Sequence, residues 1–176
     1  MRLFIAVNFE KSVVDSLVSL QEYLRSSGVT GNYTKRENLH MTLAFIGEYG
    51  NPDDVLDAME FVELKLMTVM LNGARHFRDM YFAIAEEDQR LKGYVRRLRR
   101  ALAENGIPFD RKKFSPHITL IRKASYVNGL PELAELPVIK TEASRVSLML
   151  SERGKNGMIY SELGYIEAER KNYNGS

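Results

Sequence analysis

The chain has 176 residues, of which 44% are hydrophobic and 27% charged, as in a globular protein with a core of ordinary size. It contains no cysteine, which excludes disulfide frameworks and thiolate metal sites. The formal net charge of +2 permits an anionic ligand without demanding nucleic acid. No apolar run is long enough to span a membrane, and the opening MRLFIAVNF is too short for a signal peptide and lacks a cleavage site. We therefore expect a cytoplasmic protein with no membrane association.

The first predicted elements are a strand and a helix. Residues 2–9 form a short apolar run typical of a strand, and an amphipathic helix is predicted over 12–26. Ser12 with Asp15 predicts a capping pair at its start, and Gly28 predicts its end. The apolar stripe of this helix has spacings of three and four: Val13, Leu17, Leu20 and Leu24.

A second strand is predicted over 39–47, and Asn51-Pro52 opens a second helix, because proline suits a first helical turn. Residues 69–76 and 80–85 then predict two strands. The apolar face of the second helix is predicted to contain Val55, Met59, Val62 and Leu66.

A third helix is predicted over 88–105, with an end at Gly106 and Pro108. Its apolar stripe is Leu91, Val95, Leu98 and Leu102. Helical spacing sets four arginines on the opposite face, which favours a solvated surface over an RNA-binding patch. These are Arg96, Arg97, Arg99 and Arg100.

The last third of the chain predicts a strand over 114–121, a proline-containing loop over 129–137, and two further strands near 138–150 and 158–166. No low-complexity segment or interdomain linker is present. A single domain spanning residues 1–176 is therefore expected.

A strand–helix–strand unit occurs twice in this order. Phe4 precedes His40 by nearly the same number of residues as Phe82 precedes His117. Each copy ends in the pattern His-x-Thr-Leu, at residues 40–43 and 117–120. The repeat predicts two similar lobes, related by a pseudo-twofold axis and facing each other.

The two tetrapeptides carry the candidate chemistry. Because strand side chains alternate, His40 and Thr42 share one face, as do His117 and Thr119. Two facing lobes would gather two imidazoles and two hydroxyls. One imidazole can act as base and the other as acid near neutral pH, while the hydroxyls donate to phosphoryl oxygens. The set suits phosphodiester hydrolysis without a metal ion.

A lone histidine on a strand is more often structural than catalytic, so the repetition of the motif carries the functional interpretation. His76 has Arg78 instead of threonine two positions on, and it has no equivalent in the repeat. We interpret His76 as structural.

Four segments resemble the 2H phosphoesterase superfamily, specifically its LigT-like (ThpR) branch of RNA 2',3'-cyclic phosphodiesterases. They are the opening RLFIAV, NLHMTLAFIGE at 38–48, FSPHITLIR at 114–122, and the closing strands with Leu148 and Tyr160. The resemblance implies an α+β, bilobal fold: two pseudo-twofold-related antiparallel sheets, helices outside and a central cleft.

The resemblance also implies a role for each site residue. His40 would protonate the 3' leaving oxygen, and His117 would accept the proton of water, giving a 2'-phosphomonoester. Thr42 and Thr119 would hold the phosphate. Arg122 would contact phosphate or base, although its offset of five from His117 requires a bend in the strand.

The chain departs from the family at two positions. Tyr33 stands where tryptophan is usual and could still stack on a base, and Arg36 stands where proline is usual. The implied partners are RNA 3' ends or nucleotides with a 2',3'-cyclic phosphate, with no cofactor, metal or obligate protein partner.

Three other functions use the same residues. The reaction could run in reverse as 2',5' ligation of RNA ends, which the bulk concentration of water disfavours. A nucleotide-binding module without turnover would not need two titrating groups. A small-molecule hydrolase acting on ADP-ribose cyclic phosphate or 2',5'-linked oligonucleotides is compatible with the sequence, because base selection lies in loops.

Overall fold

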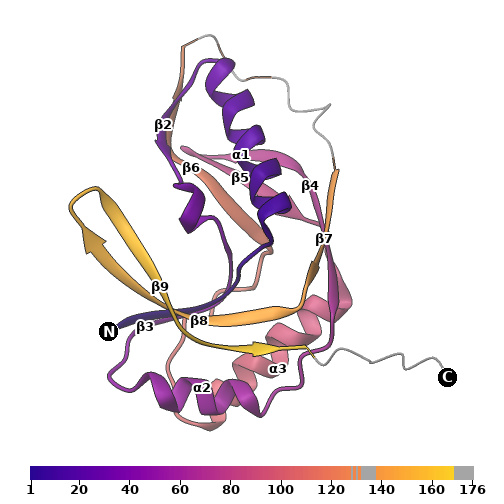
Figure 1. Cartoon of the computed structure of the whole chain (residues 1–176), viewed down its shortest axis with the longest axis vertical. Coiled ribbons are helices and arrows are strands. Elements are labelled where there is room, and N and C mark those ends of the chain that lie inside the picture. Colours follow the sequence, from indigo (N-terminus) through magenta and orange to yellow (C-terminus); the bar gives the residue numbers. More distant parts are fainter. Residues whose placement is uncertain (128, 130, 132–137, 169–176) are drawn as a thin grey trace, which may run out of the picture.

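A computed structural model of the chain describes residues 1–127, 129, 131 and 138–168. In this part the chain forms one curled antiparallel sheet of nine strands with three α-helices and a short 3-10 helix (Figure 1). The strands are β1 (Arg2–Val7), β2 (Val29–Tyr33), β3 (Met41–Glu48), β4 (Met67–Phe77), β5 (Met80–Ala85), β6 (His117–Tyr126), β7 (Val138–Ala143), β8 (Arg145–Gly154) and β9 (Gly157–Glu167). The helices are α1 (Lys11–Ser26), η1 (Arg36–Asn38), α2 (Pro52–Glu60) and α3 (Gln89–Glu104).

The sheet consists of two equivalent halves. Its strand order is β7-β4-β5-β6-β3-β1-β8-β9, and β2 adds to β6. The halves meet between β6 and β3 at one pair, Met41 opposite Ile118, which are the second residues of the two His-x-Thr motifs. An antiparallel pair has a local twofold axis between its partners, so the axis that relates the halves passes through this pair. The α+β fold with two pseudo-twofold-related antiparallel halves is confirmed.

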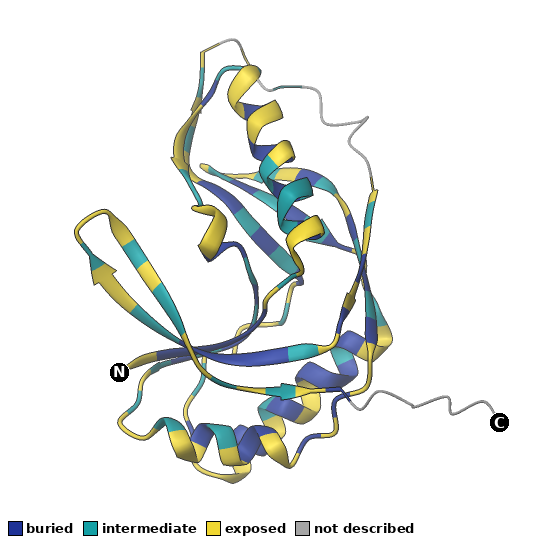
Figure 2. Ribbon diagram, viewed as in Figure 1, coloured by how far each residue is buried: buried dark blue, intermediate teal, exposed yellow. Residues whose placement is uncertain are grey.

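Helix α1 follows β1 but packs on β2, β6 and β7 of the other half. Helix α3 follows β5 and packs on β4 of its own half, on β3 of the other half and on α2 (Figure 1). The predicted apolar stripes of both helices are buried, and their other faces are exposed (Figure 2). In the part of the chain that the structure describes, no helix is long and apolar enough to cross a membrane.

The pairing register corrects the alignment of the repeat. Ala6 lies opposite Thr42, and Phe82 lies opposite Thr119, so Ala6 and not Phe4 is the counterpart of Phe82. The error arises because a short apolar strand can be shifted by two residues without changing the face that its side chains occupy.

Several predicted element boundaries were wrong. Helix α1 begins after Glu10 without a side-chain cap, and Asp15 binds Lys11 and Arg36 instead. Helix α2 ends at Glu60, which leaves Leu66 46% exposed. The predicted loop over 129–137 lies largely outside the described residues.

The sheet also has more strands than expected. Strand β2, with its exposed polar centre, was not predicted. The segment 138–150 divides at Ser144 between β7 and β8, which belong to different halves of the sheet.

Candidate active site

The four motif side chains project from one face of the sheet at the junction of its halves. Met41 and Ile118 are both fully buried on the core side, so the residues on either side of each project oppositely. Antiparallel geometry then sets His40 beside Thr119, and Thr42 beside His117. All four are half-buried. The structure thus brings together two imidazoles and two hydroxyls, in mirrored order along the two strands.

Both imidazoles are held in the same way. Nδ1 of His40 lies 2.6 Å from the Asn38 carbonyl oxygen, and Nδ1 of His117 lies 2.6 Å from the Ser115 carbonyl oxygen. A carbonyl can only accept, so each Nδ1 carries the hydrogen and donates it. In the neutral ring this leaves the lone pair on Nε2. Nε2, which forms no hydrogen bond with the main chain, is therefore the basic nitrogen of each neutral imidazole.

Nε2 of His40 lies 2.9 Å from Thr42 Oγ1. When His40 is neutral, the Thr42 hydroxyl donates to this nitrogen. When His40 is protonated, Nε2 donates instead, and the hydroxyl hydrogen of Thr42 is free for another acceptor. The protonation of His40 thus controls the donor that Thr42 can offer.

Burial lowers the pKa of His40 from its usual 6.5, because the charged ring loses hydration. The hydrogen bond to the Asn38 carbonyl opposes this shift, and the nearby positive charges of Arg122 and His117 lower the pKa further. In the free protein the neutral form of His40 is therefore favoured.

Aromatic side chains surround the histidines. Ring centroids of Phe4 and Tyr160 lie 4.9 and 5.3 Å from that of His40, and Phe82 lies 4.7 Å from His117. Phe4 also belongs to a small apolar cluster that is separate from the main core. Sequence reasoning named these aromatics in the repeat and in the family resemblance but did not assign them to the site, although the uninterrupted apolar run of β1 indicates a strand covered on both faces.

Asn38 is another site residue that sequence reasoning missed. It is buried, its carbonyl accepts from His40, and its side-chain amide donates to the Met158 carbonyl at 2.8 Å. Asn38 therefore links the start of the first motif to the hairpin formed by β8 and β9. A buried asparagine of this kind has no periodic signature in the sequence.

Each motif strand carries a β-bulge directly after its threonine. The β1–β3 register passes from Ile5–Ala44 to Ala6–Thr42, so Leu43 is an extra residue. The β5–β6 register skips Leu120 in the same way.

The bulge at Leu120 brings Arg122 to the site. Leu120 and Ile121 are both fully buried, so the alternation shifts by one residue and Arg122 returns to the face of His117. This bulge supplies the irregularity in the strand that Arg122, five residues after His117, needs in order to share the face of that histidine. Arg122 is exposed, and its charge acts on His40.

A helix side chain holds the carbonyl of each bulge. Nε2 of Gln21 in α1 donates to the Leu120 carbonyl at 3.0 Å and to the Thr34 carbonyl at 2.8 Å. Arg99 in α3 donates to the Leu43 carbonyl through Nη2 at 3.2 Å and Nε at 3.3 Å. Arg99 is thus half-buried and structural rather than part of a solvated face, whereas Arg96, Arg97 and Arg100 are exposed as expected.

The structure does not bring Tyr33 into this group. Tyr33 pairs with Ile121, which is buried on the core side, and its ring packs against the main core beneath the guanidinium of Arg25. Its hydroxyl donates to the Val29 carbonyl at 2.6 Å.

His76 likewise lies away from the motif residues. Its Nε2 is bonded to the Tyr126 hydroxyl, and its ring packs against Tyr81 and Tyr126. His76 pairs with Tyr81 across β4 and β5, and Tyr81 pairs with the buried Ile121, so this aromatic cluster lies on the core side of the sheet.

The family model for LigT-like phosphoesterases matches residues 7–80 and 83–160. The chain is 26% identical to the RNA 2',3'-cyclic phosphodiesterase of Thermotoga maritima over 176 residues, covering 93% of each protein. It is also 26% identical to the RNA 2',3'-cyclic phosphodiesterase of Aeropyrum pernix over 173 residues, covering 89% of this chain and 97% of the relative.

Solved structures agree on the fold. E. coli LigT complexed with 3'-AMP superposes with a TM-score of 0.81 at 20% identity, covering 96% of this chain and 98% of that one. A Thermus thermophilus protein superposes with a TM-score of 0.74 at 26% identity, covering 97% of this chain and 100% of that one.

Proposed function

The chain belongs to the family of LigT-like phosphoesterases, and from this premise we propose that it hydrolyses 2',3'-cyclic phosphates to 2'-phosphomonoesters. The substrates are RNA 3' ends or nucleotides that carry the cyclic phosphate, as the names of the relatives in Thermotoga maritima and Aeropyrum pernix suggest. The observation that carries the proposal is the twofold-related placement of His40 and His117, each with Nδ1 donating to a main-chain carbonyl and Nε2 on the side of the two threonines.

In the proposed reaction, water attacks phosphorus and the bond from phosphorus to the 3' oxygen breaks. His117 Nε2 takes the proton of the attacking water, and His40 Nε2 gives its proton to the departing oxygen. The product keeps its phosphate on the 2' oxygen. The two histidines end with their protonation states exchanged, and proton exchange with solvent restores them.

The hydroxyls and Arg122 supply charge stabilisation. Thr42 and Thr119 lie beside the two imidazoles and donate to the non-bridging phosphoryl oxygens. Protonation of His40 frees the hydrogen of Thr42 for this purpose. Arg122 adds a positive charge on the same face.

The low pKa of His40 in the free protein would, taken alone, suit a base. A bound phosphate is an anion and raises the pKa of a neighbouring imidazole, which restores the protonated form that a proton donor needs. In the proposed reaction His40 is therefore the acid and His117 the base. Ligation through a 2',5' linkage uses the same groups in reverse and is the secondary activity of this proposal.

The test is product analysis. Purified protein is incubated with nucleoside 2',3'-cyclic phosphates in EDTA, and the phosphomonoester isomers are separated by chromatography. We expect 2'-phosphomonoesters, formed at the same rate with or without EDTA. A 3'-phosphomonoester, or activity that EDTA abolishes and Mg²⁺ or Mn²⁺ restores, would contradict the proposal.

A further inference from the structure

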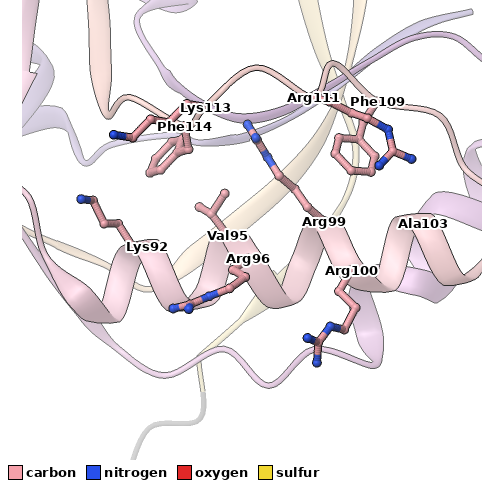
Figure 3. Close-up of a pocket in the computed structure, with 10 residues that line it drawn as sticks. All are labelled: Lys92, Val95, Arg96, Arg99, Arg100, Ala103, Phe109, Arg111, Lys113 and Phe114. Atoms are coloured by element: carbon pink, nitrogen blue, oxygen red, sulfur yellow. The ribbon is translucent and has the colours of Figure 1, made fainter.

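A groove lies between α3 and the segment 109–114, away from the histidine pair (Figure 3). Its volume is about 470 Å³, within the range of about 300–1,000 Å³ typical of ligand sites. In Figure 3 the side chains of Phe109 and Phe114 lie along one wall, and Val95 and the basic residues of α3 lie along the other.

The groove concentrates positive charge. Six of its lining residues are basic and none is acidic: Lys92, Arg96, Arg99, Arg100, Arg111 and Lys113. Glu87 pairs with Lys92 at 2.8 Å, and the charge of Asp110 acts on Arg99. Among the described residues, no carboxylate forms an ion pair with Arg96, Arg100 or Arg111. Because the whole chain carries only +2, this local excess is a specific feature and not a reflection of overall charge.

The groove is already formed in the free protein. Arg99 donates to the Lys112 carbonyl at 2.7 Å, which fixes the segment to the helix. The Asp110 main-chain nitrogen donates to the Phe45 carbonyl at 2.8 Å, which fixes it to β3. A preformed site loses little conformational entropy when a ligand binds.

We propose that this groove binds the phosphodiester backbone of single-stranded RNA on the 5' side of the reacting end. A basic groove lined by aromatic rings is the usual means of binding single-stranded nucleic acid without sequence preference. Phe114 is three residues before His117, so their Cα atoms lie at most about 11 Å apart. The segment that lines the groove therefore leads directly into the strand that carries His117. The placement of the RNA 3' end rests on the proposed function, whereas binding of the backbone does not.

The test compares two double charge reversals on the same helix. R96E/R100E alters the groove, and R90E/R97E makes the same change of charge at exposed arginines that do not line it. Binding is measured by fluorescence anisotropy with a single-stranded RNA that ends in a 3' hydroxyl. Its length is about ten nucleotides, within the about 4–16 that single-strand sites usually cover.

We expect R96E/R100E to weaken binding at least about tenfold and R90E/R97E to leave it unchanged. Loss of two phosphate contacts should also reduce the slope of log K against log salt by about 1.4. Equal binding by both variants would overturn the proposal. So would a poly-glutamate peptide that competes as well as RNA, because the groove would then fit an acidic protein.

Kinetics separate this proposal from the proposed function. With a cyclic-phosphate oligonucleotide, R96E/R100E should raise KM at least about tenfold, while hydrolysis of the mononucleotide 2',3'-cyclic phosphate stays at the wild-type rate. Wild-type protein that binds the RNA through the groove but hydrolyses neither substrate would refute the proposed function and leave the groove assignment standing. An equal loss on both substrates would refute the groove assignment.

Discussion

His40 is held by three neighbours that each affect its proton. The Asn38 carbonyl fixes the hydrogen on Nδ1, Thr42 faces Nε2, and the charge of Arg122 lowers the pKa. His117 repeats the first of these features through Ser115. The two imidazoles thus have the same tautomer in different electrostatic surroundings, which is what an acid and a base acting on one substrate require.

The pH dependence follows from this environment. If His40 must be protonated, kcat/KM should fall as pH rises through its pKa in the free protein, which lies below 6.5. In kcat the same limb should lie at higher pH, because the bound phosphate favours the protonated ring. Arg122→Gln removes a cation that lowers this pKa, so the kcat/KM limb should move to higher pH. Arg122→Lys is the matched control and should leave it in place.

These pH profiles are measured with a mononucleotide substrate. A kcat/KM limb that does not move in Arg122→Gln would contradict the assignment of His40 as the group that loses the proton. The two limbs of each profile belong to the histidine pair, because close titrating groups are coupled.

Replacing Thr42 with valine tests the role of the hydroxyl. Thr42→Val keeps the shape of the side chain and removes the donor, so turnover should fall by about 10²–10³ while the fold survives. Thr119→Val should behave similarly. Thr68→Val, the same change on β4, is the control and should leave turnover unchanged. Unchanged turnover in Thr42→Val would show that its hydroxyl has only a structural role.

The residues of the two motifs could be predicted because they repeat. Asn38 and Tyr160 could not, since their importance comes from contacts with distant strands. Tyr33 is the opposite case, a residue predicted at the site that lies elsewhere. Its sequence position relative to His40 predicted a place in the site, but the pairing of β2 with β6 directs its ring to the core.

At the scale of elements, the two bulges shape the site. They follow both motifs at equivalent positions, Leu43 and Leu120, and the second brings Arg122 to the histidine face. Neither bulge contains a glycine or another residue that marks it in the sequence, so only the need for a bend could be predicted. The helices were predicted well because their apolar stripes are long and regular, whereas β2 has no such stripe.

Gln21 is expected to stabilise the second bulge. Gln21→Met preserves the volume of a buried side chain and removes the donor to the Thr34 and Leu120 carbonyls. The free energy of unfolding should fall by roughly 1–3 kcal/mol, because the Thr34 carbonyl loses this partner. Chemical denaturation measures the change, with the exposed Ser19→Met as the control on the same helix. Stability equal to wild type would show that this contact does not hold the bulge.

At the scale of the whole molecule, the twofold arrangement explains why one site contains two copies of the same group. The symmetry ends beyond the threonines, because Arg122 corresponds to Phe45 in the other half. The charge of Arg122 acts on His40 across the junction, and the ring of Tyr160 also packs against His40, whereas the counterpart of Arg122 in the other half is uncharged. A ribose cyclic phosphate is itself asymmetric, and this difference can select one orientation of it.

One comparison distinguishes most directly whether His40 is the acid and His117 the base. His40→Ala and His117→Ala are each assayed on a 2',3'-cyclic nucleotide and on a nitrophenyl ester of a nucleotide, whose leaving group needs no protonation. We predict that the activated ester partly rescues His40→Ala and rescues His117→Ala much less, because water still lacks its base. Rescue of His117→Ala alone would reverse the assignment, and rescue of neither variant would contradict the paired mechanism.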